Sequence, residues 1–147
     1  GPGSFTKIRE TLKRQFKLPL PQGEPGDGYT LARHREAFEG FLAFLKANLA
    51  GQTAIRVDGS WCSQSVALAS FGDFALPDAV LREEELAEAL PELARRVGRE
   101  DVAPIVPEAF AAPFSLADIH DSALEELIAD VYQRDYMMFG FEPWNPA

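Results

Sequence analysis

The segment from Phe38 to Leu49 constrains the fold most, because its apolar residues recur at the spacing of an α-helix. Those residues are Phe38, Phe41, Leu42, Leu45 and Leu49. The stripe that they form is wide enough to lie at the centre of a hydrophobic core. Gly51 follows the last of them, at a place where glycine commonly ends a helix. The sequence therefore predicts a central amphipathic helix that stops at Gly51.

Two further helices are predicted on the same grounds, one near each end of the chain. The apolar positions of the first are Phe5, Ile8, Leu12 and Phe16. A loop rich in proline and glycine follows it, between Pro19 and Gly28. The apolar positions of the last helix are Leu124, Leu127, Ile128, Val131 and Met138. We expect Asp121 or Ser122 to cap the start of this helix and Gly140 to end it.

The middle of the chain has weaker signals. Thr53 to Val57 and Ala75 to Leu81 are β-prone runs and predict short extended segments. A helical pattern follows them, but Pro91 lies inside it, and proline removes a backbone hydrogen-bond donor. We therefore expect two short helices, Glu83 to Ala89 and Pro91 to Val97, followed by a loop from Gly98 to Phe114. The predicted fold is mainly α with short extended segments.

Composition limits the class of protein. Gly1 to Ser4 reads as a protease-cleavage scar, and the remaining residues, 5–147, suffice for a single domain with a real core. No apolar run approaches the roughly 18 residues that a membrane-spanning helix needs. Cys62 is the one cysteine, so no internal disulfide can form, which favours a reducing, cytoplasmic location.

Charge argues against a nucleic-acid partner, because the net charge is −9 and affinity for phosphate backbones depends on Lys and Arg. The charge is also uneven along the chain. Nine basic and five acidic residues precede Val57, whereas five basic and 18 acidic residues follow from there. The basic first third could face an anionic donor, or the acidic helices could simply carry solvated faces.

Three short motifs occur in a fixed order and carry the functional information. The first, DGSWCSQ, runs from Asp58 to Gln64, and the second places Arg82, Glu84 and Leu86 at the start of a predicted helix. The third is a closing helix with the residues Tyr132, Asp135, Phe139 and Gly140. In this order they resemble the C-terminal part of the membrane-associated (Golgi-type) class of sulfotransferases and its bacterial relatives. Ser60 and Ser63 stand where that family has His and Pro.

The resemblance implies an activity and a missing part. It implies a C-terminal fragment of an α/β (P-loop-like) sulfotransferase fold, whose parent enzyme transfers a sulfuryl group from 3'-phosphoadenosine 5'-phosphosulfate to a hydroxyl or amine. The family binds that donor through a phosphate loop upstream of these motifs. No such loop occurs in this sequence, and Phe5 to Ile8 looks like the helix just after the donor site. We therefore expect the donor-binding half to be absent and this chain alone to be inactive.

On the same resemblance, five residues are expected to bind a small-molecule or carbohydrate acceptor. They are Asp58, Trp61, Gln64, Arg82 and Glu84. The indole of Trp61 would offer a flat platform at the edge of a cleft, and the Gln64 amide would bind a hydroxyl. Trp61 could instead be a core aromatic residue and Asp58 a turn former. On a helix, Arg82 and Glu84 would point to different faces and would not pair, whereas in an extended segment they would share one face. Both could also simply be solvated.

Asp135 is the one charged residue on the apolar face of the last helix, seven residues after Ile128. A buried carboxylate needs a partner, so we expect Asp135 to bind a backbone group or an arginine and to act structurally. His34 and His120 are weak candidates for catalysis, and no group of residues has metal-ligand spacing. Two alternative functions remain open: a non-catalytic binding module derived from the same fold, and a protein-interaction module that uses the acidic helices.

Overall fold

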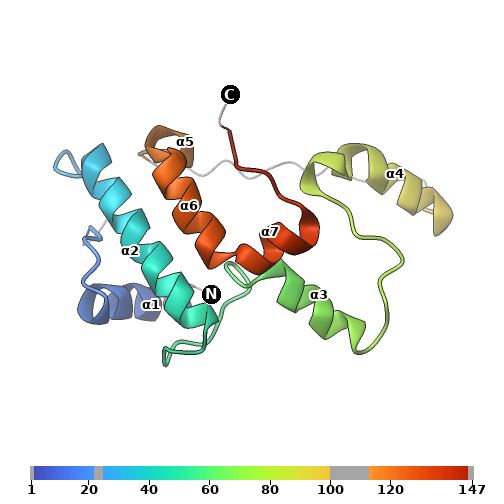
Figure 1. Ribbon diagram of the computed structural model, residues 1–147, viewed down its shortest axis with the longest axis horizontal. Coiled ribbons are helices and arrows are strands. Elements are labelled where there is room, and N and C mark those ends of the chain that lie inside the picture. Colours follow the sequence, from blue (N-terminus) through green and yellow to red (C-terminus); the bar gives the residue numbers. More distant parts are fainter. Residues whose placement is uncertain (1, 22–24, 100–112, 146–147) are drawn as a thin grey trace. The chain divides into compact units, whose positions relative to one another are not determined.

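The computed structural model describes residues 2–21, 25–99 and 113–145, with the side chains of residues 2–7 left out (Figure 1). Several predictions fall outside this range: the scar residue Gly1, Gly23 of the first loop, the side chain of Phe5, and most of the loop from Gly98 to Phe114. The chain divides into two compact units, each of which we describe by itself. Unit 1 comprises Gly1–Ala69 and Ala112–Ala147, and unit 2 comprises Ser70–Ala111.

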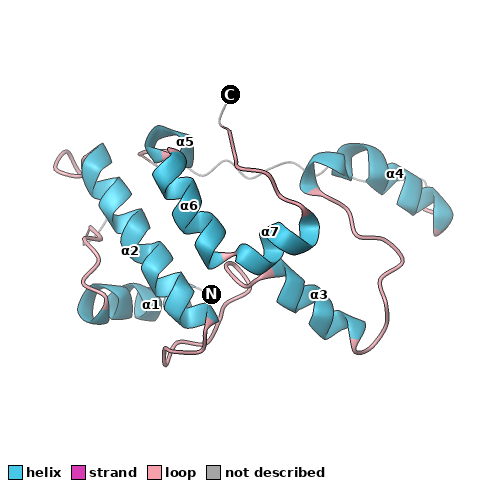
Figure 2. Ribbon diagram, in the orientation of Figure 1, coloured by secondary structure: helices cyan, strands magenta, loops and turns pink. Residues whose placement is uncertain are grey.

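The described residues form helices joined by loops, without a strand (Figure 2). In chain order the elements are α1 (Pro2–Gln15), α2 (Leu31–Leu49), α3 (Gln64–Gly72), the 3-10 helix η1 (Glu83–Glu85), α4 (Leu86–Arg96), α5 (Leu116–Ile119), α6 (Ser122–Val131) and α7 (Gln133–Phe139). The mainly helical prediction is thus confirmed. None of the described helices has the length and apolar character that crossing a membrane requires.

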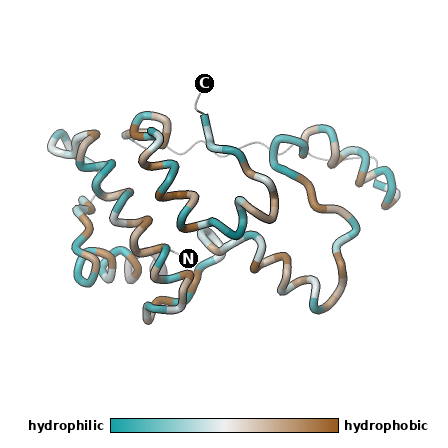
Figure 3. Tube along the Cα trace, viewed as in Figure 1, coloured by the Kyte–Doolittle hydropathy of each residue, from teal (hydrophilic) through white to brown (hydrophobic). Residues whose placement is uncertain are grey.

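The core of unit 1 lies around α2, which packs against α5 and α6. Apolar residues recur along α2 and α6 in Figure 3, as the periodicity predicts. The buried members of the core are Leu12, Leu18, Leu42, Phe44, Leu45, Trp61, Ile119 and Leu124. Phe44 is fully buried, and its ring forms a T-shaped pair with the ring of Phe16, with the two centroids 5.0 Å apart. The predicted stripe on α2 is therefore central to the core, although it did not include Phe44.

The C-terminus of α2 has the predicted glycine cap. Gly51 adopts φ = 71°, a left-handed conformation that costs a residue with a Cβ atom. The Gly51 N–H donates to the carbonyl of Asn48, and the Gln52 N–H donates to the carbonyl of Ala47. These two bonds form a Schellman motif, which satisfies carbonyls that the helix itself leaves unpaired.

The predicted last helix is two helices. Asp121 caps α6 as expected, accepting a hydrogen bond from the Leu124 N–H. The chain then departs from helical geometry at Tyr132, where φ is −111° and ψ is 27°. The break is compatible with anchoring of this residue, because the Tyr132 hydroxyl bonds across to the loop before α3. Gly140 ends α7 in the left-handed conformation, which confirms the predicted end.

Two predictions for the middle of the chain are wrong. The runs Thr53–Val57 and Ala75–Leu81 are loops, because a β-prone run becomes a strand only beside a partner, and the described residues provide none. In unit 2, α4 continues through Pro91 where we expected two short helices. Proline fits the backbone angle φ of a helix and removes one hydrogen bond, which the rest of α4 tolerates here.

Candidate functional site

The DGSWCSQ motif forms a tight turn that leads into α3. One carboxylate oxygen of Asp58 accepts hydrogen bonds from both the N–H and the hydroxyl of Ser60, at 3.0 and 2.8 Å. These bonds hold the pKa of Asp58 below its ordinary value. The backbone N–H of Trp61 donates to the backbone carbonyl of Asp58 and closes the turn. Asp58 is therefore a turn former, as one of the two interpretations of this residue predicted.

Trp61 is a core residue, which corrects the expectation of a partly exposed platform. The residue is 8% exposed, and its ring forms T-shaped pairs with the rings of Phe41 and Phe44, with centroids 6.2 Å apart in each pair. Its indole N–H donates to the side-chain oxygen of Asn48 at 2.9 Å. A buried indole needs such an acceptor, and α2 supplies it from within its apolar face.

Asn48 was missed by the sequence analysis, although it lies three residues after Leu45 on the predicted stripe. It is 1% exposed, and its amide donates to the Thr53 hydroxyl and to the Ile55 carbonyl. Asn48 thus joins α2, the following loop and Trp61. A polar residue on an apolar stripe is the signal that could have identified it.

Asp135 connects α7 to the beginning of α3. It is 3% exposed and accepts hydrogen bonds from the Ser63 hydroxyl at 2.7 Å, the Gln64 N–H at 2.9 Å and the Ser65 N–H at 3.0 Å. Burial alone would raise the pKa of Asp135, but these hydrogen bonds outweigh it and lower the pKa. The predictions that Asp135 is buried and bound to backbone groups are confirmed.

Tyr132 makes a second connection between the same two segments. Its hydroxyl donates to the carbonyl of Trp61 at 3.0 Å, and burial raises the pKa of this phenol. The first and third motifs, some 70 residues apart, are therefore joined. The Tyr132 side chain bonds to the backbone of Trp61, and the Asp135 side chain bonds to the backbone of Gln64 and of the next residue, Ser65.

A hollow of about 230 Å³ lies where the two motifs meet. We call it the tryptophan hollow; its lining residues are Ser60, Trp61, Cys62, Gln64, Tyr132, Asp135, Tyr136 and Phe141. Gln64 is exposed at its edge, whereas Trp61 contributes to its inner wall. Its volume is below the roughly 300–1,000 Å³ typical of ligand pockets, so it suits one ring-sized group. Aromatic side chains with a few polar atoms are the usual lining of such a site.

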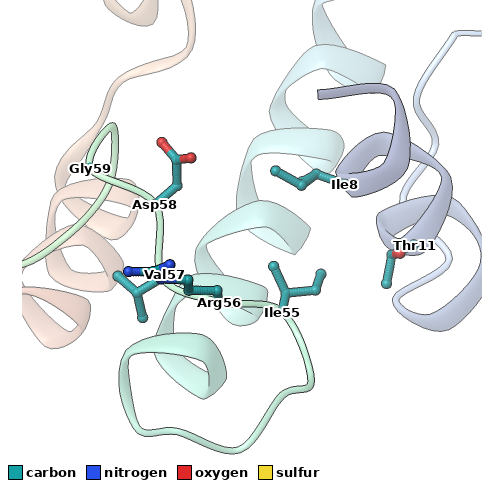
Figure 4. A pocket seen from close by; sticks show the side chains of 7 residues that line it. All are labelled: Ile8, Thr11, Ile55, Arg56, Val57, Asp58 and Gly59. Atoms are coloured by element: carbon teal, nitrogen blue, oxygen red, sulfur yellow. The ribbon is translucent and has the colours of Figure 1, made fainter. Parts of the chain in front are cut away.

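Asp58 faces a different hollow, of about 490 Å³, which Figure 4 shows. The hollow lies between α1, represented by Ile8 and Thr11, and the loop from Ile55 to Gly59. It is open, and Arg56 is the cation on its loop side. The structure therefore places Asp58 and Gln64 of the same motif at two different hollows.

Arg82 and Glu84 belong to unit 2, whereas the other three predicted site residues belong to unit 1. Arg82 Nη1 lies 3.8 Å from Glu84 Oε1. Arg82 has extended geometry before η1, so the pair fits the extended alternative, in which the two side chains share a face. Both side chains are largely exposed, so this ion pair adds little stability.

The two histidines form separate contacts within unit 1. His34 Nδ1 lies 3.0 Å from the Tyr29 hydroxyl. His120 lies against Glu125, with 2.9 Å between Nε2 and Oε2, and both side chains are buried. Glu125 also accepts a hydrogen bond from the Tyr136 hydroxyl at 2.7 Å. The sequence analysis did not single out Glu125.

A metal site is not evident in the part of the chain that the structure describes: no three His, Cys, Asp or Glu side chains gather as ligands. Comparison of the chain with known protein families, with curated proteins and with solved structures gave no match.

Proposed function

We propose that this chain is the acceptor-side part of a sulfotransferase. The reaction moves a sulfuryl group from 3'-phosphoadenosine 5'-phosphosulfate to a hydroxyl or amine on a carbohydrate or another small molecule. The sulfur–oxygen bond to the donor phosphate breaks, a bond from sulfur to the acceptor atom forms, and the acceptor loses a proton. The donor-binding half lies outside these 147 residues, in a protein of the bacterial cytoplasm.

One observation carries the proposal: the first and third motifs of the resemblance meet in space. Asp135 binds Ser63, Gln64 and Ser65, and Tyr132 binds the carbonyl of Trp61. Four of the motif residues thus line one hollow: Trp61, Gln64, Tyr132 and Asp135. These hydrogen bonds join residues about 70 positions apart, which is what the proposal needs of two motifs that share one site.

The tryptophan hollow suggests how an acceptor would be held. Gln64 offers an amide that both donates to and accepts from a hydroxyl, and the aromatic wall offers a flat apolar surface. Holding the acceptor in one orientation is the part of catalysis that this chain would contribute. Stabilisation of charge on the transferred group would come from the donor-binding half. Arg82 and Glu84 remain proposed acceptor ligands.

A pair of titrations tests the proposal. We expect calorimetry with adenosine 3',5'-bisphosphate to give no saturable heat with this chain, because its sequence has no glycine-rich anion loop. The natural gene product should bind the same nucleotide and transfer labelled sulfate to an acceptor. Replacing Gln64 by Ala there should raise KM by about tenfold, the effect of losing roughly one hydrogen bond, whereas the exposed Gln133→Ala should not.

The contrary outcomes are distinct. Saturable binding by this chain would mean that the basic first third contains a donor site. Failure of the natural gene product to bind the nucleotide or to transfer sulfate would contradict the proposal and favour a non-catalytic module.

A further inference from the structure

The segment after α7 turns back over the helix that precedes it. Gly140 has φ = 63°, which reverses the chain, and the Phe141 N–H donates to the carbonyl of Tyr136 at 3.1 Å. The rings of Phe141 and Tyr136 lie edge to face, with 5.9 Å between centroids. Both side chains line the tryptophan hollow. The start of this segment is therefore a wall of the candidate acceptor site.

The other end of the segment is attached at a different place. The ring of Trp144 meets the ring of His120 edge to face, with centroids 4.9 Å apart. His120 Nε2 in turn lies 2.9 Å from Oε2 of Glu125. In Figure 1 the segment runs from the end of α7 back toward α5 and α6. Both ends of the segment are thus held within unit 1.

Glu125 connects these two attachments. It is 7% exposed, it accepts a hydrogen bond from the Tyr136 hydroxyl, and it contacts His120, against whose ring Trp144 packs. Burial alone would raise the pKa of Glu125, but the hydrogen bonds outweigh it and lower the pKa. The wall of the hollow and the distal end of the segment therefore depend on the same buried carboxylate.

Between its two attachments the segment is weakly held. Glu142 and Pro143 are exposed, and Trp144 itself is 44% exposed. Segments with little buried surface open at a low free-energy cost. A glycine at the start of the segment can absorb the change in backbone angles that opening requires.

We propose that residues 140–144 form a strap that closes one side of the tryptophan hollow, with Gly140 as its hinge and Glu125 as its latch. Release of the latch frees Trp144 and Tyr136, and Phe141 then moves away from the hollow. The strap controls entry of the acceptor; in that respect the inference rests on the proposed function. The motion itself does not depend on which ligand occupies the hollow.

Cys62 provides a direct test, because it is the only cysteine of the chain and lines the same hollow. The rate of its alkylation by N-ethylmaleimide, followed by mass spectrometry, reports how open the hollow is. We expect Glu125→Gln and Trp144→Ala each to accelerate alkylation by about tenfold, which corresponds to losing roughly one net hydrogen bond or ring contact. Glu126→Gln, at the exposed neighbouring position on α6, should leave the rate unchanged.

Circular dichroism must show that each variant is folded. If Glu125→Gln does not fold, Trp144→Ala decides, because it leaves the carboxylate and its other partners in place. An unchanged alkylation rate in folded Trp144→Ala would overturn the strap. The assay contains neither donor nor acceptor, so that outcome would leave the proposed sulfotransferase function standing, and absence of sulfate transfer would leave the strap standing.

Discussion

At the scale of single residues, Asp135 is the side chain on which the candidate site most depends. Replacing it by Ala leaves the Ser63 hydroxyl and the Gln64 and Ser65 N–H groups without their acceptor. Because the site is buried, we expect a loss of about 2–4 kcal/mol in the free energy of unfolding, measured by urea denaturation. Asp130→Ala is the matched control, since Asp130 makes an exposed ion pair and should change stability by less than about 0.5 kcal/mol.

The contribution of Asp135 should depend on pH in one direction. Its pKa in the folded protein lies below the ordinary value of 3.8, so folding favours the ionised form. The stabilisation is therefore present above pH 3.8 and is lost as the pH falls through the folded-state pKa. The stability difference between wild type and Asp135→Ala should shrink over that range. A stability difference that stays constant would mean that the Asp135 carboxylate remains charged over this pH range, or that its charge contributes nothing to stability.

At the scale of elements, the end of α2 positions the loop that carries Trp61. Gly51→Ala forces a Cβ atom into the left-handed conformation, so we expect a loss of about 1–2 kcal/mol in the free energy of unfolding. Gly59→Ala is the control, because a Cβ atom there meets nothing within 4 Å and φ is not positive. Equal midpoints of thermal unfolding for the two variants would contradict the Schellman geometry.

Elements with a local cause could be predicted from the sequence, and those that depend on distant partners could not. The glycine caps at Gly51 and Gly140 and the Asp121 cap follow from residues within one helical turn. The break of the last helix at Tyr132 does not, because it coincides with a bond to Trp61 from 71 positions away. Burial of Trp61 likewise required Asn48 as acceptor, a pairing that spacing alone cannot reveal.

The same distinction applies to the candidate site. Periodicity predicted a buried, paired Asp135, and the resemblance singled out Trp61, Gln64 and Tyr132. The resemblance placed Asp58, Trp61 and Gln64 together at one cleft; it did not predict that Tyr132 and Asp135 would line the hollow of Trp61 and Gln64 while Asp58 lines another. Which hollow a side chain reaches depends on the hydrogen bonds that tie the start of α3 to Asp135 of α7, and hence on contacts far apart in the sequence.

At the scale of the whole molecule, the described buried core and helix α4 lie in different units. Among the residues that the structure describes, every buried core residue belongs to unit 1. In unit 2, α4 has an apolar stripe at Leu86, Leu90 and Leu93, yet within the described residues none of its side chains is buried. Since burial of an amphipathic face supplies most of the stability of a helix in a protein, the two units should differ in how easily they open.

Hydrogen exchange measures this difference directly, because α2 and α4 are both α-helices but only α2 has buried side chains among the described residues. An amide in α2 becomes accessible only when Phe44, Leu45 and Asn48 leave the core, which approaches global unfolding. An amide in α4 becomes accessible to exchange through local opening of that helix alone. We therefore expect exchange in α4 to be faster than in α2 by at least about 100-fold, after each rate is divided by the intrinsic rate of the same amide in an unstructured chain at the same pH. Equal protection would mean that the apolar stripe of α4 is covered in solution, and that unit 2 is as firmly folded as unit 1.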